Sequence, residues 1–132
     1  MLDLAVNYGP SPISIPDLAK RADIPIKFLE QILLELKKGR FVESRRGKVG
    51  GYLLSRPPAK ITLGEVVRFI DGPIEPIACA RDGYKGCGDL HGCVFKEIWS
   101  QISEYTSGII DRINFEDLAI KSHKPKELIY QI

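Results

Sequence analysis

No apolar run in this sequence approaches the ~20 residues that a helix needs to cross a membrane. The first residues also lack the basic start and the cleavage site of a secretory signal peptide. Both absences favour a cytoplasmic protein without a membrane partner. There is no internal repeat, and 132 residues suffice for one domain with a modest core.

Patterns of catalytic residues are absent as well. The chain has no glycine-rich phosphate loop with a Walker lysine, no nucleophile elbow, and only two histidines, His91 and His123. We therefore predict a protein that is not an enzyme and has no catalytic residues. His123 is expected to lie on the surface.

Cysteine is scarce, and all three cysteines fall in one stretch, at Cys79, Cys87 and Cys93. The stretch is rich in glycine and poor in aliphatic residues, so it can form neither a long helix nor a core. Clustered cysteines in the cytoplasm are more often metal ligands or redox groups than disulfides. Thiolates suit iron–sulfur clusters, zinc or copper(I), and these spacings are short enough for one site.

The ligand set remains open because such sites normally take four ligands. His91 is one candidate for the fourth; a residue elsewhere in the chain, a residue of a second subunit and a small molecule are others. Two interpretations without a metal compete, in which His91 is an exposed loop histidine and the cysteines are unliganded, oxidisable thiols.

Charge is unevenly distributed although the formal net charge is only +2. Residues 1–60 carry 11 Lys and Arg against 6 Asp and Glu, whereas residues 61–132 carry 8 against 11. The basic first half is compatible with a polyanionic partner, and equally with a solvated surface.

Helix signals in the first third of the chain predict a helix-turn-helix. Ser14, Pro16 and Asp17 favour the start of a helix over residues 14–21, and Pro25 opens a second helix that ends at Gly39. Helical spacing predicts that Phe28, Leu29, Ile32, Leu33 and Leu36 face inward, and that Lys27, Glu30, Gln31, Leu34 and Lys38 face outward. The outward side chains could read base edges, although most polar faces are only solvated.

Two strand-like runs follow, at residues 41–44 and 52–55. The segment between them contains glycines that allow a turn and three cations, Arg45, Arg46 and Lys48. A hairpin directly after a helix-turn-helix is a wing, and a wing arginine can reach a phosphate or a narrow minor groove. Gly50 and Gly51 would also let the backbone approach DNA closely. These features together predict binding to double-stranded DNA.

The second half of the chain contains a capping box, Thr62 with Glu65, that predicts a helix over residues 62–70. From Val94 a long helix is expected, since apolar residues recur within an arc of about 140°. A stripe of this length is longer than one small domain can bury, so we predict a partner helix and a symmetric homodimer. The predicted dimerisation residues are Phe95, Ile98, Trp99, Ile102, Tyr105, Ile109, Ile110 and Ile113. Asn114 then favours a short terminal helix, followed by a tail from Lys124.

Three segments, residues 24–32, 46–54 and 61–67, resemble the Rrf-two (Rrf2) family of bacterial winged-helix repressors. The motifs that carry the resemblance are Leu29-Glu30-Gln31 and the Arg-Gly-x-x-Gly-Gly-Tyr run from Arg46 to Tyr52. The resemblance covers nearly the whole chain. It implies a dimer with crossed long helices, a cluster near the start of each long helix, and DNA read by the helix that begins at Pro25 and by the wing.

Carried over by position, the resemblance implies an iron–sulfur cluster held by Cys79, Cys87 and Cys93. It also implies that Glu30 and Gln31 contact bases and that Arg46 lies in the minor groove. The DNA-binding residues that we predict are Lys27, Phe28, Glu30, Gln31, Arg45, Arg46, Lys48 and Tyr52. One branch of the family has a histidine three residues after the last cysteine, where this chain has Lys96, so the cluster type, 2Fe-2S or 4Fe-4S, stays open. Phe28 replaces the family's usual tyrosine and has no hydroxyl to offer a phosphate.

We therefore expect a mainly α-helical fold with a small β-hairpin. It would comprise a winged helix-turn-helix domain over residues 1–72, a cofactor loop over 73–93, and a dimerisation helix with a tail over 94–132. The expected function is that of a dimeric transcriptional repressor that senses cluster status, redox or nitric oxide. The alternatives are a regulator of the same fold that senses thiol oxidation, a metabolite or a partner protein, and a small iron–sulfur electron carrier.

Overall fold

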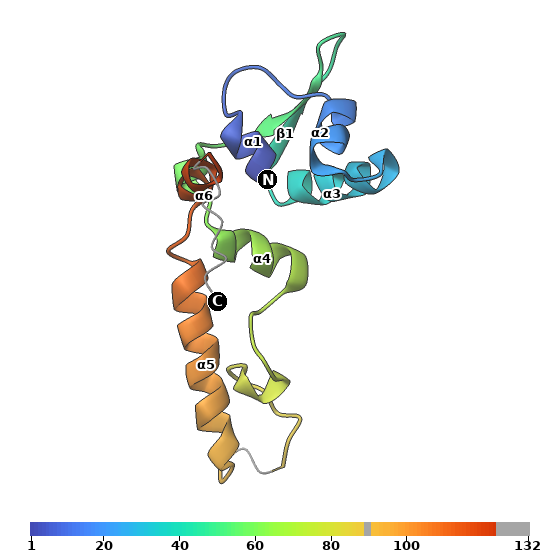
Figure 1. The fold of residues 1–132 in the computed structure, drawn as a ribbon. Coiled ribbons are helices and arrows are strands. Elements are labelled where there is room, and N and C mark those ends of the chain that lie inside the picture. The colour runs from blue at the N-terminus through green and yellow to red at the C-terminus, as the bar shows by residue number, and fades with distance from the viewer. Residues whose placement is uncertain (89–90, 124–132) are drawn as a thin grey trace, which may run out of the picture. The chain divides into compact units, whose positions relative to one another are not determined.

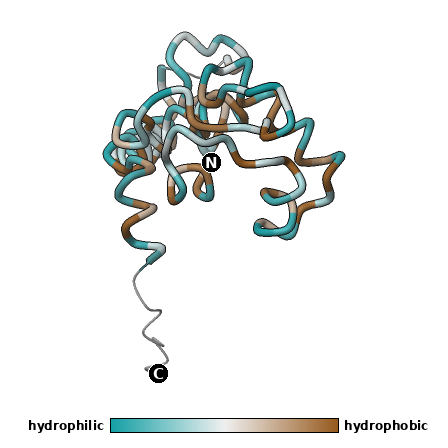
Figure 2. Tube along the Cα trace, turned by 90° about the horizontal axis from the view of Figure 1, so that it is seen from above, coloured by the Kyte–Doolittle hydropathy of each residue, from teal (hydrophilic) through white to brown (hydrophobic). Residues whose placement is uncertain are grey.

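The computed structural model describes residues 1–88 and 91–123 (Figure 1). Within these ranges the fold is mainly helical with one two-stranded antiparallel sheet, which confirms the predicted fold class. Two residues of the cysteine loop and the predicted tail from Lys124 lie outside the described residues. No helix in the described ranges has the length and apolarity that a bilayer crossing requires. Hydrophobic and hydrophilic residues alternate in short stretches along the described chain (Figure 2).

The chain forms two compact units. The first combines Met1–Ile61 with the C-terminal segment that begins at Asn114, and the second is Thr62–Ile113. The predicted division into residues 1–72, 73–93 and 94–132 does not coincide with these units. It remains a prediction about the roles of the segments.

The described residues of the first unit form five helical elements and the hairpin. They are α1 (Leu2–Val6), α2 (Ile15–Ala22), α3 (Ile26–Lys38), β1 (Val42–Arg45), β2 (Gly51–Leu54), the 3-10 turn η1 (Pro58–Lys60) and α6 (Phe115–Ser122). As predicted, Ser14 caps α2 by accepting a hydrogen bond of 3.2 Å from the Asp17 backbone N–H. Asp23 ends α2 in the left-handed conformation at φ 53°. Every element contributes to one hydrophobic core, whose largest fully buried side chains are Ile61 and Val42.

Helix α6 returns to this first unit and packs against α1 and η1 (Figure 1). The Phe115 N–H donates a hydrogen bond of 3.0 Å to the carbonyl of Ile61. Asn114 caps the helix by accepting a hydrogen bond of 2.9 Å from the Asp117 N–H. The predicted terminal helix is therefore present, and the buried ring of Phe115 makes it part of the first unit's core.

The hairpin is joined to the segment before α2. Arg45 lies opposite Gly51 in the sheet register, and Ile13 and Tyr52 exchange two backbone hydrogen bonds of 2.9 Å each. A Cβ at position 51 would collide with the Ile13 carbonyl, so only glycine permits this approach. Gly51 therefore serves a contact inside the fold, a role that the sequence did not reveal.

Replacing Gly51 by alanine should destabilise the first unit because the new methyl group meets rigid backbone. We expect the free energy of unfolding to fall by about 1–3 kcal/mol, the usual cost of overpacking. The measurement is a urea unfolding curve. Gly9→Ala is the matched control, since a Cβ at position 9 meets nothing within 4 Å. Equal midpoints for the two variants would contradict this role of Gly51.

The second unit contains α4 (Leu63–Asp71), the 3-10 turn η2 (Ala78–Ala80) and α5 (Val94–Ile110). The capping box is confirmed: the Glu65 N–H donates to the Thr62 hydroxyl at 3.1 Å, and the Thr62 N–H donates to the Glu65 carboxylate at 2.8 Å. Arg68 of α4 forms a two-point ion pair with Asp111, at 2.5 and 3.0 Å. The hydrogen bonds from Arg68 lower the pKa of the Asp111 carboxyl.

Helix α5 is shorter than the apolar stripe suggested. It ends at Ile110, and Asp111 caps it while bound to Arg68. Ile113 was predicted to extend the stripe but lies beyond the end of α5, where its carbonyl accepts a hydrogen bond of 2.8 Å from the Leu63 N–H. The prediction that the helix continues through position 113 was wrong, because Leu63 of α4 forms a hydrogen bond with the backbone of Ile113.

Candidate nucleic-acid interface and cysteine loop

Helix α3 presents one buried line and one open face. Leu29, Leu33 and Leu36 are buried in the first unit's core. The side chains expected to read DNA, Lys27, Glu30 and Gln31, are all exposed. The open face therefore offers a cation, a carboxylate and an amide near the start of the helix, the groups that form hydrogen bonds with base edges and phosphates.

Phe28 does not lie on the inward face as helical spacing suggested. Its side chain is 62% exposed. The core contacts α3 along the line of Leu29, Leu33 and Leu36, and position 28 is turned about 100° away from position 29. Phe28 thus adds an apolar ring to the open face, where it could contact the methyl group of a thymine.

The three cations of the wing differ in whether they form an ion pair. Arg45 belongs to β1 and pairs with Glu43 at 3.2 Å. Arg46 and Lys48 are exposed and make no salt bridge within the described part of the chain. Tyr52 is half-buried in β2. Two of the three predicted cations therefore remain available to a polyanion.

Sequence reasoning missed Val49, which projects from the turn with 88% of its surface exposed. Its position between Lys48 and Gly50, within the predicted turn, was the signal that could have found it. A valine at this point could pack against deoxyribose or a base edge once the tip meets DNA.

The three cysteines occupy different settings in the second unit. Cys79 lies in η2 and is half-buried, Cys87 is exposed, and Cys93 is the half-buried residue that precedes α5. None forms a disulfide. His91, the candidate fourth ligand, is exposed.

These positions do not converge on one point. Among the described residues, no group of three His, Cys, Asp or Glu side chains is close enough to hold a metal ion. The donor set nevertheless fits an iron–sulfur cluster chemically, since three free thiols stand in one glycine-rich stretch. The loop would have to close to bring the three sulfur atoms together.

The apolar stripe of α5 is largely open. Its exposed members are Phe95, Ile98, Ile102, Tyr105 and Ile109, and Tyr105 has 73% of its surface exposed. Trp99 and Ile110 are half-buried. Of the described apolar side chains in Thr62–Ile113, only Val66 is buried, so this unit has very little core of its own. A contiguous apolar surface of this kind is typical of an interaction site.

A family model described as an iron-dependent transcriptional regulator, Rrf2, matches residues 1–121. The chain belongs to the Rrf2 family. An rrf2-like HTH-type transcriptional regulator of Rhodobacter capsulatus is 34% identical over 98% of this chain and 89% of the relative. The HTH-type transcriptional regulator IscR of Klebsiella pneumoniae is 33% identical over 89% of this chain and 71% of the relative.

Solved structures of Rrf2-type regulators share the fold. CymR of B. subtilis, described as the global cysteine regulator, superposes with a TM-score of 0.74 at 29% identity, over 91% of this chain and 87% of CymR. IscR of T. potens gives a TM-score of 0.74 at 27% identity, over 99% of this chain and 84% of IscR.

This Rrf2 chain is thus a DNA-binding transcriptional regulator of the IscR and CymR type. Its relatives and structural neighbours are regulators and not enzymes, which agrees with the prediction from the sequence. The predicted resemblance to the family is confirmed.

Proposed function

We propose that this protein is a dimeric repressor that reads double-stranded DNA with α3 and the wing and senses the state of an iron–sulfur cluster. The protein would act on DNA in the cytoplasm. The observation that carries the DNA-reading part is the open face of α3 in the same unit as Arg46 and Lys48, two wing cations that form no salt bridge with any described residue. Glu30 and Gln31 would contact bases, while Arg46 would enter the minor groove.

Dimerisation would follow from the open stripe of α5. A helix that leaves Phe95, Ile98 and Tyr105 exposed, in a unit with one buried apolar side chain among those described, gains stability when a second copy covers it. Two heads would then meet successive major grooves, and half-sites would lie about one helical turn or a multiple of it apart.

The cysteine loop would supply the signal. Bound to Cys79, Cys87 and Cys93, an iron–sulfur cluster would provide redox chemistry and reactivity toward oxidants and nitric oxide. The loop connects α4 to α5, so its closure or opening would shift the segment that begins the dimerisation helix. The family's iron-dependent description supports this proposal.

A regulator of the same fold without a cluster is the second candidate. It is favoured by the separate settings of the three thiols and by the similarity to CymR, a cysteine regulator. In that case thiol oxidation, a metabolite or a partner protein would replace the cluster. An electron carrier is disfavoured because the relatives are transcriptional regulators.

Two substitutions test the reading face. Glu30→Ala should change the preferred base at one operator position, by about 1–3 kcal/mol of discrimination. Arg46→Ala should weaken binding to the operator and reduce the slope of log affinity against log salt by about one. The measurement is fluorescence anisotropy on an operator selected in vitro from random duplexes.

Matched controls lie on α6 of the same unit, where Glu116 and Lys121 are exposed. Glu116→Ala and Lys121→Ala should leave base preference and salt slope unchanged. If Glu30→Ala and Arg46→Ala bind the selected operator as the parent protein does, the assigned reading face is wrong.

A further inference from the structure

The open face of α3 contains a leucine that the proposed function leaves without a role (Figure 1). Leu34 is 46% exposed, whereas the other three leucines of this helix are at most 6% exposed. At 100° per residue, it lies within about 60° of Lys27, Gln31 and Lys38 around the helix axis. Leu34 therefore belongs to the stripe that is expected to face DNA, and not to the core.

The polar side chains around Leu34 leave it accessible. Lys38, on the next turn, forms an ion pair of 2.6 Å with Glu35, which lies about 100° from Leu34 around the helix. The side chains of Glu30 and Gln31, on the preceding turn, form no ion pair or hydrogen bond with any described residue. The stripe thus combines an apolar centre with a carboxylate and an amide that remain available to bases.

The major groove of DNA offers an apolar side chain one specific partner. Its base edges present hydrogen-bond donors and acceptors, and thymine alone adds a methyl group, at C5. Contact between Leu34 and this methyl group would remove apolar surface of both partners from water. Opposite any other base, the leucine would cover polar groups and give them no hydrogen bond, which is unfavourable. A leucine on the reading face therefore discriminates in favour of thymine.

We propose that Leu34 is a specificity-determining residue that reads the methyl group of one thymine in each half-site. This assignment rests on the proposed function, in which the open face of α3 enters the major groove. The three residues from Gln31 to Leu34 advance about 4.5 Å along the helix, and successive base pairs are about 3.4 Å apart. The thymine should therefore lie within about two base pairs of the base that Gln31 contacts.

Replacement of single thymines by deoxyuridine tests this contact, because uracil differs from thymine only by the missing C5-methyl group. Fluorescence anisotropy on the full chain, with the operator selected in vitro, measures the affinity for each substituted duplex. We expect one thymine per half-site at which uracil weakens binding of the parent protein about fourfold, the effect of burying one methyl group. Leu34→Ala should bind the thymine and uracil duplexes equally, and both about as weakly as the parent protein binds uracil.

Two variants control for side-chain chemistry and for position. Leu34→Met keeps an apolar side chain at position 34 and should keep the response to uracil. Ile120→Ala removes an apolar side chain that is 58% exposed on α6 of the same unit, and it should respond like the parent protein. Alanine is the strongest helix former, so Leu34→Ala should preserve α3, which circular dichroism verifies.

An operator at which no thymine responds to uracil would overturn the assignment of Leu34, and so would a Leu34→Ala variant that retains the response. A response that Phe28→Ala abolishes and Leu34→Ala retains would assign the methyl contact to Phe28 instead. Each of these results leaves the proposed function intact, provided that Glu30→Ala and Arg46→Ala behave as predicted above. If those two variants bind as the parent protein does, the reading face itself is wrong and the assignment of Leu34 fails with it.

Discussion

Ile98→Glu and Tyr105→Glu together should convert the protein from a dimer to a monomer. Both side chains lie on the open stripe of α5, with 52% and 73% of their surfaces exposed in the single chain. Two carboxylates in an apolar interface cannot be solvated there, so association is lost. Operator affinity should fall by about 10²–10⁴-fold, because each half-site is then bound without the avidity of its neighbour. Analytical ultracentrifugation and fluorescence anisotropy measure the two effects.

Gln101→Glu provides the control for this prediction. It adds a negative charge to the same exposed helix, but position 101 lies outside the arc of the stripe. We expect this variant to remain dimeric and to bind the operator as the parent protein does. A double variant that still sediments as a dimer would show that another surface holds the subunits together.

The second large effect concerns the cysteines. Anaerobically purified protein should contain iron and acid-labile sulfide and show visible absorbance, and the Cys79→Ser, Cys87→Ser, Cys93→Ser triple variant should contain none of these. Serine removes the thiolates that hold a cluster while it preserves side-chain size. Metal and sulfide analysis with absorbance spectroscopy gives the result.

Histidine variants refine this test. His91→Ala should reduce iron content if His91 is the fourth ligand, and His123→Ala at the C-cap of α6 serves as the matched control. A colourless parent protein without sulfide, whose operator affinity still changes on thiol oxidation, would favour the cluster-free regulator.

Local signals in the sequence located most of the fold. Ser14, Thr62 and Asn114 cap the helices that their positions predicted, since a capping hydrogen bond joins residues only three apart. The hairpin and the long helix also followed from spacing within short segments. These features depend on neighbours in the chain and can therefore be read from it.

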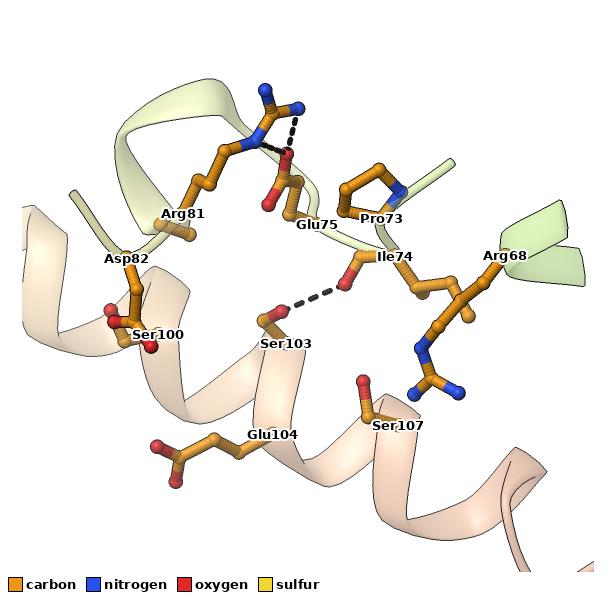
Figure 3. Close-up of a pocket in the computed structure, with 11 residues that line it drawn as sticks. Arg68, Pro73, Ile74, Glu75, Arg81, Asp82, Ser100, Ser103, Glu104 and Ser107 are labelled. Carbon is orange, nitrogen blue, oxygen red and sulfur yellow. Dashed lines mark hydrogen bonds and ion pairs between the residues drawn. The ribbon is translucent and has the colours of Figure 1, made fainter. Parts of the chain in front are cut away.

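Contacts between distant segments could not be predicted in this way. Phe28 is exposed because of where the core meets α3, and Ile113 leaves the helix because of a hydrogen bond with Leu63, fifty residues earlier. Gly51 is required by the backbone of Ile13. The cavity lined by Arg68, Ile74 and Ser103 likewise combines α4, a loop and α5 (Figure 3), so it could not be predicted from any single segment of the sequence.

The same distinction between local signals and contacts of distant segments applies to the candidate DNA-binding site and the cysteine loop. The open face of α3 and the cations of the wing were recognisable from motifs, while the pairing of Arg45 with Glu43 and the exposure of Val49 needed the structure. Convergence of the three cysteines was a chemical inference from their residue types. In the described residues the three thiols are not close enough to bind one metal centre, so the loop would have to rearrange to bind a cluster.

The central claim is that the state of an iron–sulfur cluster on Cys79, Cys87 and Cys93 controls reading of DNA. The most direct test titrates one operator with anaerobically purified protein, before and after cluster removal, with iron and sulfide quantified in each sample. We predict that the cluster is present and that its removal changes the Kd at least about tenfold, which corresponds to about 1.4 kcal/mol of coupling. A colourless protein without sulfide, with the same Kd as its triple serine variant, would contradict the claim.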